Sequence, residues 1–373
     1  MKEKTLTIIF ILALGFLSMA NLLAPSKVFS TKENRYLQQF PTLTIKDIMS
    51  NNFSANFDTY ASDQFIARDK WIGLKTLVDK SILKKDNGRV YFGKDGYLFD
   101  VKPAINQEQF DKNIKNINLL SVDLKEINKD LIINAVMVPT KASVLSNKLP
   151  LYAPVMDEKE LFKQIEKELS NNINLVDLKE KLQTHNNEAI YYKTDHHWTS
   201  LGAFYAYQEF LTDQALAKDD FIIKEVTNEF LGTSYRKANF YLNSPDTIEK
   251  YIAKNASDII VTIDEKNQTS SLYDESYLNK TDKYAYFLGG DQAVVKINTN
   301  ITNGKDLLIL KDSFANSMIP FLTNHYRNIY VLDTRYYNGS IKDYVANLEI
   351  DEVLMLYNIE NFISEVTFSK LNK

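Results

Sequence analysis

The sequence predicts an α/β protein with a mostly parallel sheet that is covered by helices on both faces. Two observations support this prediction. Short apolar segments of strand length alternate along the chain with segments whose apolar residues recur at helical spacing, which is typical of parallel sheets. The 373 residues are 45% hydrophobic and 25% charged, a composition that suits a globular protein and excludes wholesale disorder.

The first element is an uncharged, apolar segment at residues 5–24. A helix of this length is about 30 Å long, enough to cross the hydrocarbon core of a bilayer. We therefore expect a membrane anchor over residues 1–25, a transmembrane helix ahead of the folded domain. A cleaved signal peptide is the alternative, because small residues, Ser18 and Ala20, follow the apolar stretch. Either way, the remaining chain is expected outside the cytoplasm, anchored in the cell membrane or secreted after cleavage.

Residues 26–107 are expected to form a linker, a helix and a β-hairpin that pack on the main domain. The helix is placed around residues 63–71. The hairpin is predicted at 90–99 from two aromatic runs on either side of Asp95 and Gly96. An Asp-Gly pair tolerates the positive φ that tight hairpin turns require.

Residues 108–373 form the main domain and carry the alternation of strands and helices, interrupted by a less regular excursion at 217–300. Helices are expected where apolar residues recur every three or four positions, and strands where short apolar runs occur. The predicted helices are 161–169, 201–211 and 314–322, and the predicted strands are 131–138, 189–192, 306–310, 329–332 and 353–357.

Polar residues follow each of these strands. Because ligands bind beyond the carboxyl ends of the strands in such sheets, we expect these residues to converge on one edge. In chain order they are Lys141, then Asp195, His196 and His197, then Ser313, Arg335 and Asn358. Lys141, Arg335 and Asn358 are candidates for substrate binding, although Lys141 and Arg335 are also compatible with ordinary surface charges.

Composition excludes several classes of chemistry. The chain has no cysteine, which removes thiolate metal centres, iron–sulfur clusters, disulfides and cysteine nucleophiles. It has only four histidines, which leaves little room for a metal site made of three histidines. A net charge of −4 lacks the basic excess of a nucleic-acid-binding protein, so no nucleic-acid partner is expected. A metal at Asp195, His196 and His197 is disfavoured, because adjacent histidines diverge in a strand and no further ligand cluster is visible. We expect neither a metal nor another cofactor.

Nucleophilic acyl transfer is the chemistry that fits the remaining residues. Ser313 lies at a strand-to-helix turn, where its hydroxyl projects above the sheet and backbone N–H groups face a developing oxyanion. A serine needs a base, and His196 or His197 is the best candidate. In an extended backbone Asp195 and His197 share a face, so Asp195 orients His197 while His196 points away. The alternatives are that Ser313 is only a helix N-cap and that His197 is only hydrogen-bonded in the core.

The run Thr194-Asp195-His196-His197-Trp198-Thr199 resembles the signature of the DHHW protein family, which is related to the periplasmic alginate O-acetylation proteins of the AlgX/AlgJ type. Further matching segments are Glu33-Asn34-Arg35, Asp63-x-Phe65-x-x-Arg68, Gly93-Lys94-Asp95-Gly96-x-Leu98-Phe99 and Asp312-Ser313-Phe314. The resemblance implies a three-layer α/β/α domain like that of the SGNH hydrolases, with Asp195 as orienting acid, His197 as base and Ser313 as nucleophile. Lys311 departs from the pattern, because a glycine is common there.

The resemblance also implies a function, that of an extracytoplasmic O-acetyltransferase acting on a cell-surface or exported polysaccharide. Ser313 would take the acetyl group and pass it to a sugar hydroxyl that His197 deprotonates, with a membrane-bound acetyl-transfer protein as partner. Two alternatives stay open: an acetylesterase with the same three residues and water as acceptor, and a non-catalytic polysaccharide-binding or scaffold subunit of an export complex. A buried, disconnected Ser313 would favour the non-catalytic alternative.

Overall fold

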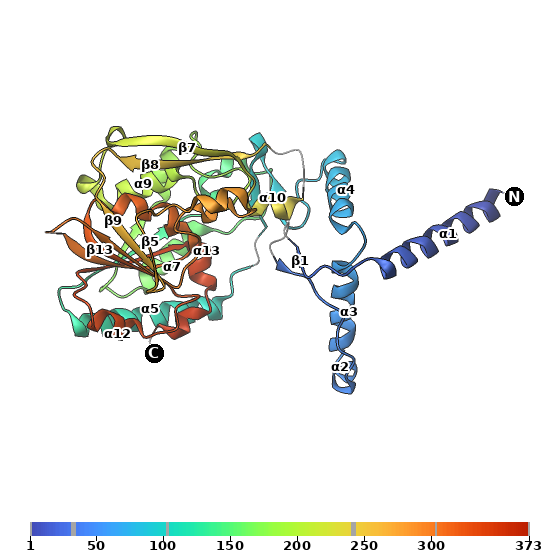
Figure 1. The fold of residues 1–373 in the computed structure, drawn as a ribbon, viewed down its shortest axis with the longest axis horizontal. Coiled ribbons are helices and arrows are strands. Elements are labelled where there is room, and N and C mark those ends of the chain that lie inside the picture. Colours follow the sequence, from blue (N-terminus) through green and yellow to red (C-terminus); the bar gives the residue numbers. More distant parts are fainter. Residues whose placement is uncertain (1, 31–34, 102–103, 240–243, 303, 372–373) are drawn as a thin grey trace. The chain divides into compact units, whose positions relative to one another are not determined.

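The computed structural model describes the chain except for residues 1, 31–34, 102–103, 240–243, 303 and 372–373 (Figure 1). Its internal contacts divide it into two units. The first consists of residues 1–87 with 236–242, and the second of residues 88–235 with 243–373. All the candidate site residues lie in the second unit.

The first unit is built mainly from helices. Within the described part of the chain, Lys4–Leu23 is the one helical segment long and apolar enough to cross a membrane. The helix predicted at 63–71 is instead the end of one helix and the start of another, separated where Ala67 takes a left-handed conformation (φ 53°). The elements are α1 (Lys2–Leu23), β1 (Phe29–Ser30), β2 (Arg35–Tyr36), α2 (Ile45–Met49), α3 (Asn52–Asp63) and α4 (Arg68–Ser81). The later helix α10 (Thr233–Ala238) begins in the second unit and ends in the first.

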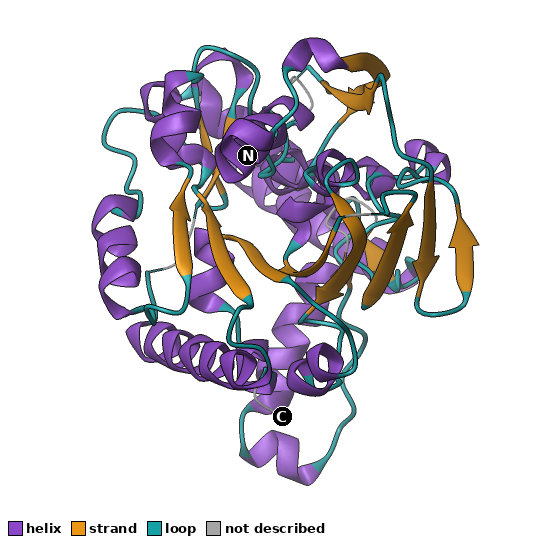
Figure 2. Ribbon diagram, turned by 90° about the vertical axis from the view of Figure 1, so that its left-hand side faces the viewer, coloured by secondary structure: helices purple, strands orange, loops and turns teal. Residues whose placement is uncertain are grey.

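An eight-stranded sheet runs through the second unit (Figure 2). Its strand order is β10-β9-β11-β13-β12-β14-β5-β6, in which the strands from β13 to β6 are parallel to one another. The strands β10, β9 and β11 pair antiparallel at the other edge. The bounds are β5 (Ile132–Val138), β6 (Asn174–Asp177), β9 (Ile259–Ile263), β10 (Asn267–Thr269), β11 (Val294–Thr299), β12 (Lys305–Lys311), β13 (Tyr326–Asp333) and β14 (Glu352–Asn358).

The sheet is therefore mixed, and the prediction that it is mostly parallel is not confirmed. The difference arises in the predicted excursion at 217–300, which supplies the three antiparallel strands. Residues 264–266 join β9 to β10, and so short a connection makes neighbouring strands antiparallel. The same region also forms a separate antiparallel ribbon of β7 (Phe221–Phe230) and β8 (Asp246–Ala253).

Helices cover both faces of the sheet because the side chains of its central strands alternate between two buried clusters. In β5, for example, Ile133, Ala135 and Met137 belong to one cluster, and Val136 and Val138 belong to the other. On the first face lie α5 (Gln107–Ile127), α7 (Glu158–Glu168), α12 (Ile341–Ala346) and α13 (Ile359–Ser364), and on the second lie α6 (Lys141–Val144), α8 (Lys179–Thr184), α9 (Ser200–Leu211) and α11 (Ile319–Leu322). Figure 1 shows α5 and α12 on one side of the sheet and α9 on the other.

The predicted β-hairpin is present in the second unit. Its strands are β3 (Val90–Phe92) and β4 (Leu98–Asp100), which pair antiparallel. Asp95 (φ 56°) and Gly96 (φ 81°) both take the left-handed conformation, as expected for an Asp-Gly turn. The connection is longer than a two-residue turn, because Lys94–Gly96 form one turn of 3-10 helix.

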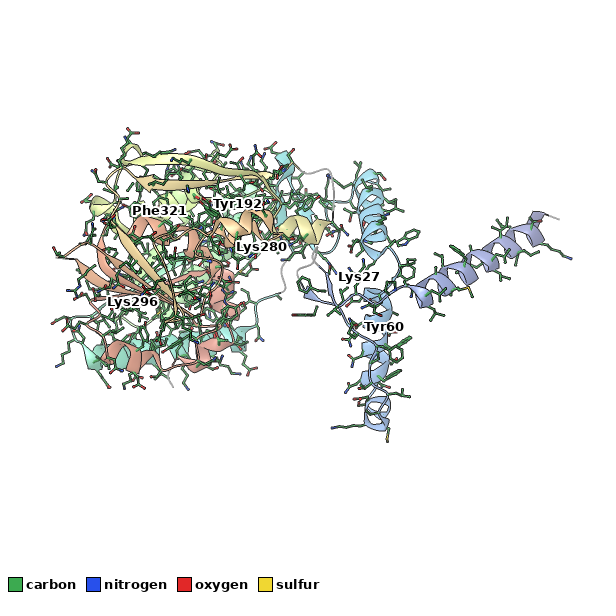
Figure 3. The ribbon with its side chains drawn as sticks, viewed as in Figure 1. Lys27, Tyr60, Tyr192, Lys280, Lys296 and Phe321 are labelled. Carbon is green, nitrogen blue, oxygen red and sulfur yellow. The ribbon has the colours of Figure 1, made fainter. Side chains whose placement is uncertain are left out.

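The segment predicted as a strand at 189–192 does not join the sheet. It folds back on itself through a bridge between Tyr191 and Trp198, so the residues between them form a tight loop ahead of α9. The helix itself is fixed by aromatic packing: the Phe321 ring (Figure 3) lies 5.7 Å from the ring of Phe204 and 5.3 Å from that of Tyr207. The loop is thus held in place by a helix that is packed against the sheet.

We predict that Gly202→Ala, in the first turn of α9, destabilises the protein. Alanine normally favours a helix over glycine by about 0.5–1 kcal/mol. Here its Cβ would lie 2.3 Å from the carbonyl oxygen of Ile190, and overpacking of this kind costs about 1–3 kcal/mol, so the clash outweighs the helical preference. Thermal unfolding should show a lower midpoint than wild type.

The matched control is Gly15→Ala, because no heavy atom lies within 4 Å of the added Cβ there. It should leave the unfolding of the folded units unchanged. An unchanged or higher midpoint for Gly202→Ala would show that α9 is not packed against the Ile190 carbonyl as described.

Candidate active site

Two segments far apart in the sequence bring the candidate site together. The first is the loop before α9, whose N-cap is Thr199. The second is the turn after β12, where Asp312 caps the 3-10 helix η7 (Ser313–Ser317) by accepting a hydrogen bond from the Phe314 N–H (2.9 Å). β12 lies parallel between β13 and β14, so the turn that carries Ser313 opens at the carboxyl end of the parallel part of the sheet.

Asp195, His197 and Ser313 form a continuous hydrogen-bonded chain. Nδ1 of His197 lies 2.6 Å from Oδ1 of Asp195, and Nε2 of the same ring lies 2.7 Å from Oγ of Ser313. Asp195 and His197 are buried, whereas Ser313 is partly exposed. The arrangement places a carboxylate, an imidazole and an accessible hydroxyl in series.

The Asp195 carboxyl is held in its ionised form. Burial alone would raise its pKa, but the adjacent His196 and His197 and the hydrogen bonds from His197 hold that pKa well below its usual range. Backbone N–H groups of His197 (2.9 Å) and Thr233 (2.6 Å) also donate to the carboxylate. An ionised Asp195 fixes the Nδ1–H tautomer of His197 and leaves Nε2 directed at the hydroxyl.

The segment around Gly232 approaches Asp195 so closely that no side chain fits between them. A Cβ at Gly232 would lie 2.2 Å from the Cβ of Asp195. The Gly232 N–H also donates to Oγ1 of Thr194 (3.1 Å), and the Tyr235 N–H donates to the Thr194 carbonyl (2.8 Å). The residues that follow β7 thereby hold Thr194 and Asp195 in place.

Trp198 ties the histidine loop to the serine turn. Its indole is fully buried, and Nε1–H donates to the carbonyl of Phe314 (3.0 Å) and to Oγ of Ser317 (2.9 Å). These bonds fix the first turn of η7 relative to His197. The spacing between the His197 ring and the Ser313 hydroxyl is therefore set by the backbone as well as by the side chains.

Lys141 lies beneath the histidine loop and supports it. Its ammonium group is buried and donates to the carbonyl oxygens of Tyr192 (3.0 Å) and Asp195 (2.6 Å). A contact of this kind orders the loop backbone. The structure thus places the first predicted substrate-binding residue under the site, with its charged group turned toward protein carbonyls.

Arg335 and Asn358 are also engaged by protein groups. The Arg335 guanidinium forms a bidentate ion pair with Asp333 and a further ion pair with Asp291 (2.9 Å). Asn358 lies beside Asp312: its backbone N–H donates to Oδ2 of that carboxylate (2.8 Å), and its side chain donates to the carbonyl of Val138 (3.0 Å). Both residues lie at the predicted edge of the sheet and brace neighbouring groups there.

The departure at Lys311 has a structural explanation. Its side chain is 1% exposed and its ammonium group lies between Asp291 (3.0 Å) and Asp333 (3.1 Å). Burial would raise the pKa of Asp291, but the charges of Lys311 and Arg335 lower it to about 2. The charge of Lys311 is therefore balanced by the two carboxylates behind the serine turn, and the lysine holds the loop that carries Asp291.

His196 does not point away from the site as predicted. Residues 193–197 form a bent loop rather than an extended strand, so the alternation of faces does not apply. The His196 ring packs against that of His197, with ring centroids 3.9 Å apart and the planes tilted by 37°, and its Nδ1 lies 3.5 Å from Oδ1 of Asp195. Asp195, His196 and His197 together offer ligand atoms within 4.8 Å of one another. Because both ring nitrogens of His197 already face Asp195 and Ser313, this group fits a proton relay better than a metal site.

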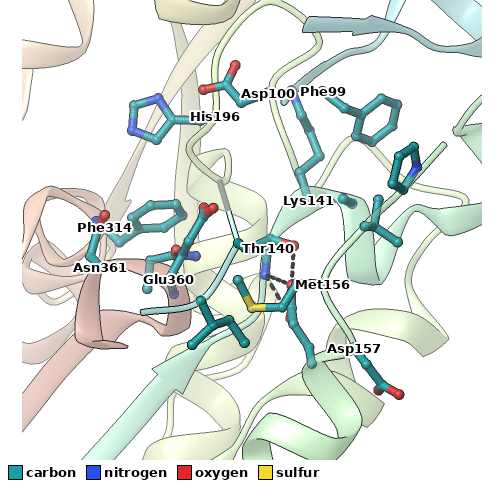
Figure 4. A pocket seen from close by; sticks show the side chains of 17 residues that line it. Phe99, Asp100, Thr140, Lys141, Met156, Asp157, His196, Phe314, Glu360 and Asn361 are labelled. Carbon is teal, nitrogen blue, oxygen red and sulfur yellow. Dashed lines mark hydrogen bonds between the residues drawn. The ribbon is translucent and has the colours of Figure 1, made fainter. Parts of the chain in front are cut away.

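A cavity of about 380 Å³ lies beside these residues (Figure 4). This volume falls within the range of small-molecule sites. His196 and Phe314, the chain neighbours of His197 and Ser313, form part of its wall. Two of the predicted substrate-binding residues, Lys141 and Asn358, also line it. The rest of the lining combines apolar and aromatic side chains with carboxyl groups, among them Phe99, Ile105, Val155, Met156, Asp100, Asp157, Glu158 and Glu360.

Several residues of the site were not predicted from the sequence. Tyr284, Gly232 and Thr233 all come from the excursion at 217–300, whose irregular pattern gave no reason to place it near Ser313. Tyr284 stacks on the His197 ring, as described below. The one local signal is the aromatic run Tyr284-Ala285-Tyr286-Phe287 in an otherwise polar stretch.

Comparison with known proteins gives one family and several structural neighbours. A family model described as DHHW protein matches residues 88–332, whereas no curated protein sequence matches the chain. A DHHW family protein from Eubacterium siraeum DSM 15702 is 26% identical, with a TM-score of 0.64 over 76% of this chain and 95% of that one. Bacillus cereus PatB1 is 25% identical, with a TM-score of 0.63 over 74% and 97%. The O-acetyltransferase domain of Pseudomonas putida AlgJ is 17% identical, with a TM-score of 0.48 over 74% and 92%.

Glu158, in the wall of the cavity, predicts a pH-dependent stability. Burial raises the pKa of its carboxyl from 4.5 to about 7, although Thr140 donates to it through its N–H and hydroxyl groups. The folded protein keeps the proton between these two values while the unfolded chain releases it, so the contribution to stability falls as pH rises from about 4.5 to 7. Glu158→Gln should therefore be more stable than wild type at pH 8, by ~3 kcal/mol, and similar to wild type at pH 4.

Chemical denaturation at the two pH values measures this difference. Asp157→Asn is the matched control, because the neighbouring carboxyl is exposed. An equal effect of Glu158→Gln at both pH values would contradict a protonated Glu158 in the folded state.

Proposed function

The chain belongs to the DHHW protein family, and from this premise we propose that it is an extracytoplasmic, serine-dependent O-acetyltransferase acting on a cell-surface or exported polysaccharide. One observation carries the proposal: the partly exposed Ser313 hydroxyl is hydrogen-bonded to His197, which is oriented by a buried, ionised Asp195. The α-helical layers on both faces of the sheet support an SGNH-hydrolase-like arrangement of the domain. The apolar helix α1 supports an attachment to the cell membrane, with a cleaved signal sequence as the alternative.

In the first half of the proposed reaction, Ser313 takes the acetyl group. His197 Nε2 accepts the hydroxyl proton as Oγ attacks the acetyl carbonyl of the donor, and Asp195 stabilises the imidazolium that forms. The Ser313 backbone N–H donates a hydrogen bond to the oxyanion. As the first N–H of η7, it has no acceptor within that helix. The donor oxygen then leaves with the proton from His197, and the acetyl group stays on Oγ.

In the second half, the acetyl group moves to the acceptor. His197 deprotonates a sugar hydroxyl, whose oxygen attacks the acetyl carbon, and Ser313 Oγ leaves and recovers the proton. We assign the cavity beside His196 as the binding site of the sugar. Its aromatic side chains suit the apolar faces of a sugar ring, and its carboxyl groups can hydrogen-bond to the sugar hydroxyls. A membrane-bound protein that supplies acetyl groups is the proposed partner.

The alternatives differ in the acceptor and in the use of the serine. An acetylesterase would use the same three residues with water in place of the sugar. A non-catalytic scaffold is disfavoured by the contact of Ser313 Oγ with His197 at 2.7 Å, since a buried and disconnected serine is what a silent site would show.

We predict that Ser313→Ala and His197→Ala each lower the release of p-nitrophenol from p-nitrophenyl acetate by about 10³-fold or more. His196→Ala should keep much more activity, because its ring lines the cavity without touching the Ser313 hydroxyl in the described contacts. Folding of each variant is checked by circular dichroism. Equal rates for wild type and Ser313→Ala would eliminate the proposed nucleophile, and a larger loss in His196→Ala than in His197→Ala would reassign the base.

Transfer and hydrolysis are separated by a variant of the cavity wall. Val155 lines the cavity and is 49% exposed, so Val155→Trp can narrow the cavity without disturbing the core. With p-nitrophenyl acetate as donor and a panel of neutral and acidic oligosaccharides as acceptors, Val155→Trp should lower acetyl transfer about 10-fold and leave hydrolysis within about 2-fold of wild type.

Val155→Ala is the control and should retain both activities. Hydrolysis by wild type with no acetylated oligosaccharide from any acceptor would identify an esterase. Loss of hydrolysis and transfer to the same extent in Val155→Trp would show that the cavity does not bind the acceptor.

A further inference from the structure

The imidazole of His197 is packed among aromatic rings. On one face the phenol ring of Tyr284 lies parallel to it, with ring centroids 3.8 Å apart and an angle of 7° between the planes. The rings of His196 (3.9 Å, tilted by 37°) and Phe314 (4.8 Å, tilted by 53°) also pack against the imidazole. Since Asp195 and Ser313 occupy its two ring nitrogens, the imidazole is constrained in every direction.

Tyr284 also contacts the segment that carries the nucleophile. Its hydroxyl donates to the carbonyl of Ser313 (3.1 Å) and lies 3.1 Å from Oγ of Ser317. The residue therefore touches the base through its ring and the serine turn through its hydroxyl.

The position of Tyr284 is itself fixed by a separate aromatic cluster. It lies in the 3-10 helix η6 (Lys283–Tyr286) of the excursion and packs with Tyr192 (6.4 Å) and Phe287 (5.4 Å). The ring is 5% exposed, so it is not free to swing away from His197.

We propose that Tyr284 is a positioning residue that holds the His197 ring in line with Ser313 and stabilises its protonated form through the negative face of the phenol. This inference rests on the proposed function, in which His197 gains and loses a proton in each half-reaction. A cation is attracted to the face of an aromatic ring, and the attraction is strongest where water is excluded. Among the described contacts, the titratable groups against His197 are Asp195, His196 and Tyr284, and η7 contributes the uncharged Ser313 and Phe314. Asp312, which lies between β12 and η7, is a further buried carboxyl whose charge acts on Tyr284.

The test compares three substitutions at position 284 in the full-length protein, with p-nitrophenyl acetate as substrate. Tyr284→Leu keeps the site apolar but removes the ring face. Its kcat/KM should fall about 10-fold or more, and the acidic limb of the pH profile should move to lower pH by about 0.5–1 unit, because the protonated imidazole loses its stabilising face. Tyr284→Phe keeps the face and loses the hydroxyl, so it should lower the rate modestly and leave the acidic limb in place.

The third substitution replaces Tyr284 with 3,4,5-trifluorophenylalanine, which keeps the shape of phenylalanine and weakens the negative potential on the ring face. It should shift the acidic limb in the same direction as Tyr284→Leu, and it decides the question if the leucine variant does not fold. The structural control is Tyr286→Leu in the same 3-10 helix, whose ring packs on Tyr273 rather than on His197. This control should leave the pH profile unchanged.

An acidic limb that stays in place in both the leucine and the trifluoro variants would overturn the proposal, and so would an equal shift in Tyr286→Leu. A shift in Tyr284→Phe as large as in the leucine variant would also overturn it, because the hydroxyl and not the face would then be responsible. These outcomes are distinct from a failure of the proposed function, which Ser313→Ala reports by turning over p-nitrophenyl acetate at the wild-type rate.

Discussion

The structure of the site depends on one buried carboxylate. Asp195 is almost fully excluded from solvent, and an isolated charge in that position would be strongly unfavourable. It stays ionised because the backbone N–H groups of His197 and Thr233 and the His197 ring donate to it. Each of these donors has to be held in place by its own part of the chain. The tight loop before α9, the close approach at Gly232 and the orientation of the imidazole are all consequences of satisfying this one charge.

The excursion at 217–300 is the second source of order at the site. It extends the parallel sheet with antiparallel strands, and it brings Thr233 against the Asp195 carboxylate and Tyr284 against the His197 ring. The core α/β layers place Ser313 and Asp312 at the end of β12 without this region. Residues that contact Asp195 and His197 thus come from the part of the chain that is least regular in sequence, while Ser313 lies at the end of a strand in the most regular part.

The sequence allowed the α/β alternation, the hairpin at Asp95-Gly96 and the convergence of Asp195, His197 and Ser313 to be predicted, because each depends on local pattern or on the ends of strands. The mixed sheet was not predicted, since β9, β10 and β11 lie in a segment with polar and irregular stretches, and they pair antiparallel with one another and, through β11, with β13. The orientation of His196 was wrong for a related reason. An argument from extended backbone fails where the chain turns tightly to satisfy Lys141 and Asp195.

The central claim, that Ser313 carries the acetyl group between donor and acceptor, is tested most directly by trapping that intermediate. The full-length protein is mixed with p-nitrophenyl acetate, quenched in acid within the first turnover, digested and analysed by mass spectrometry. We expect one added acetyl group on the peptide that contains Ser313, and none on the same peptide from His197→Ala. An acetyl group on a different residue, or turnover without any acetylated Ser313 in rapidly quenched wild-type samples, would contradict it.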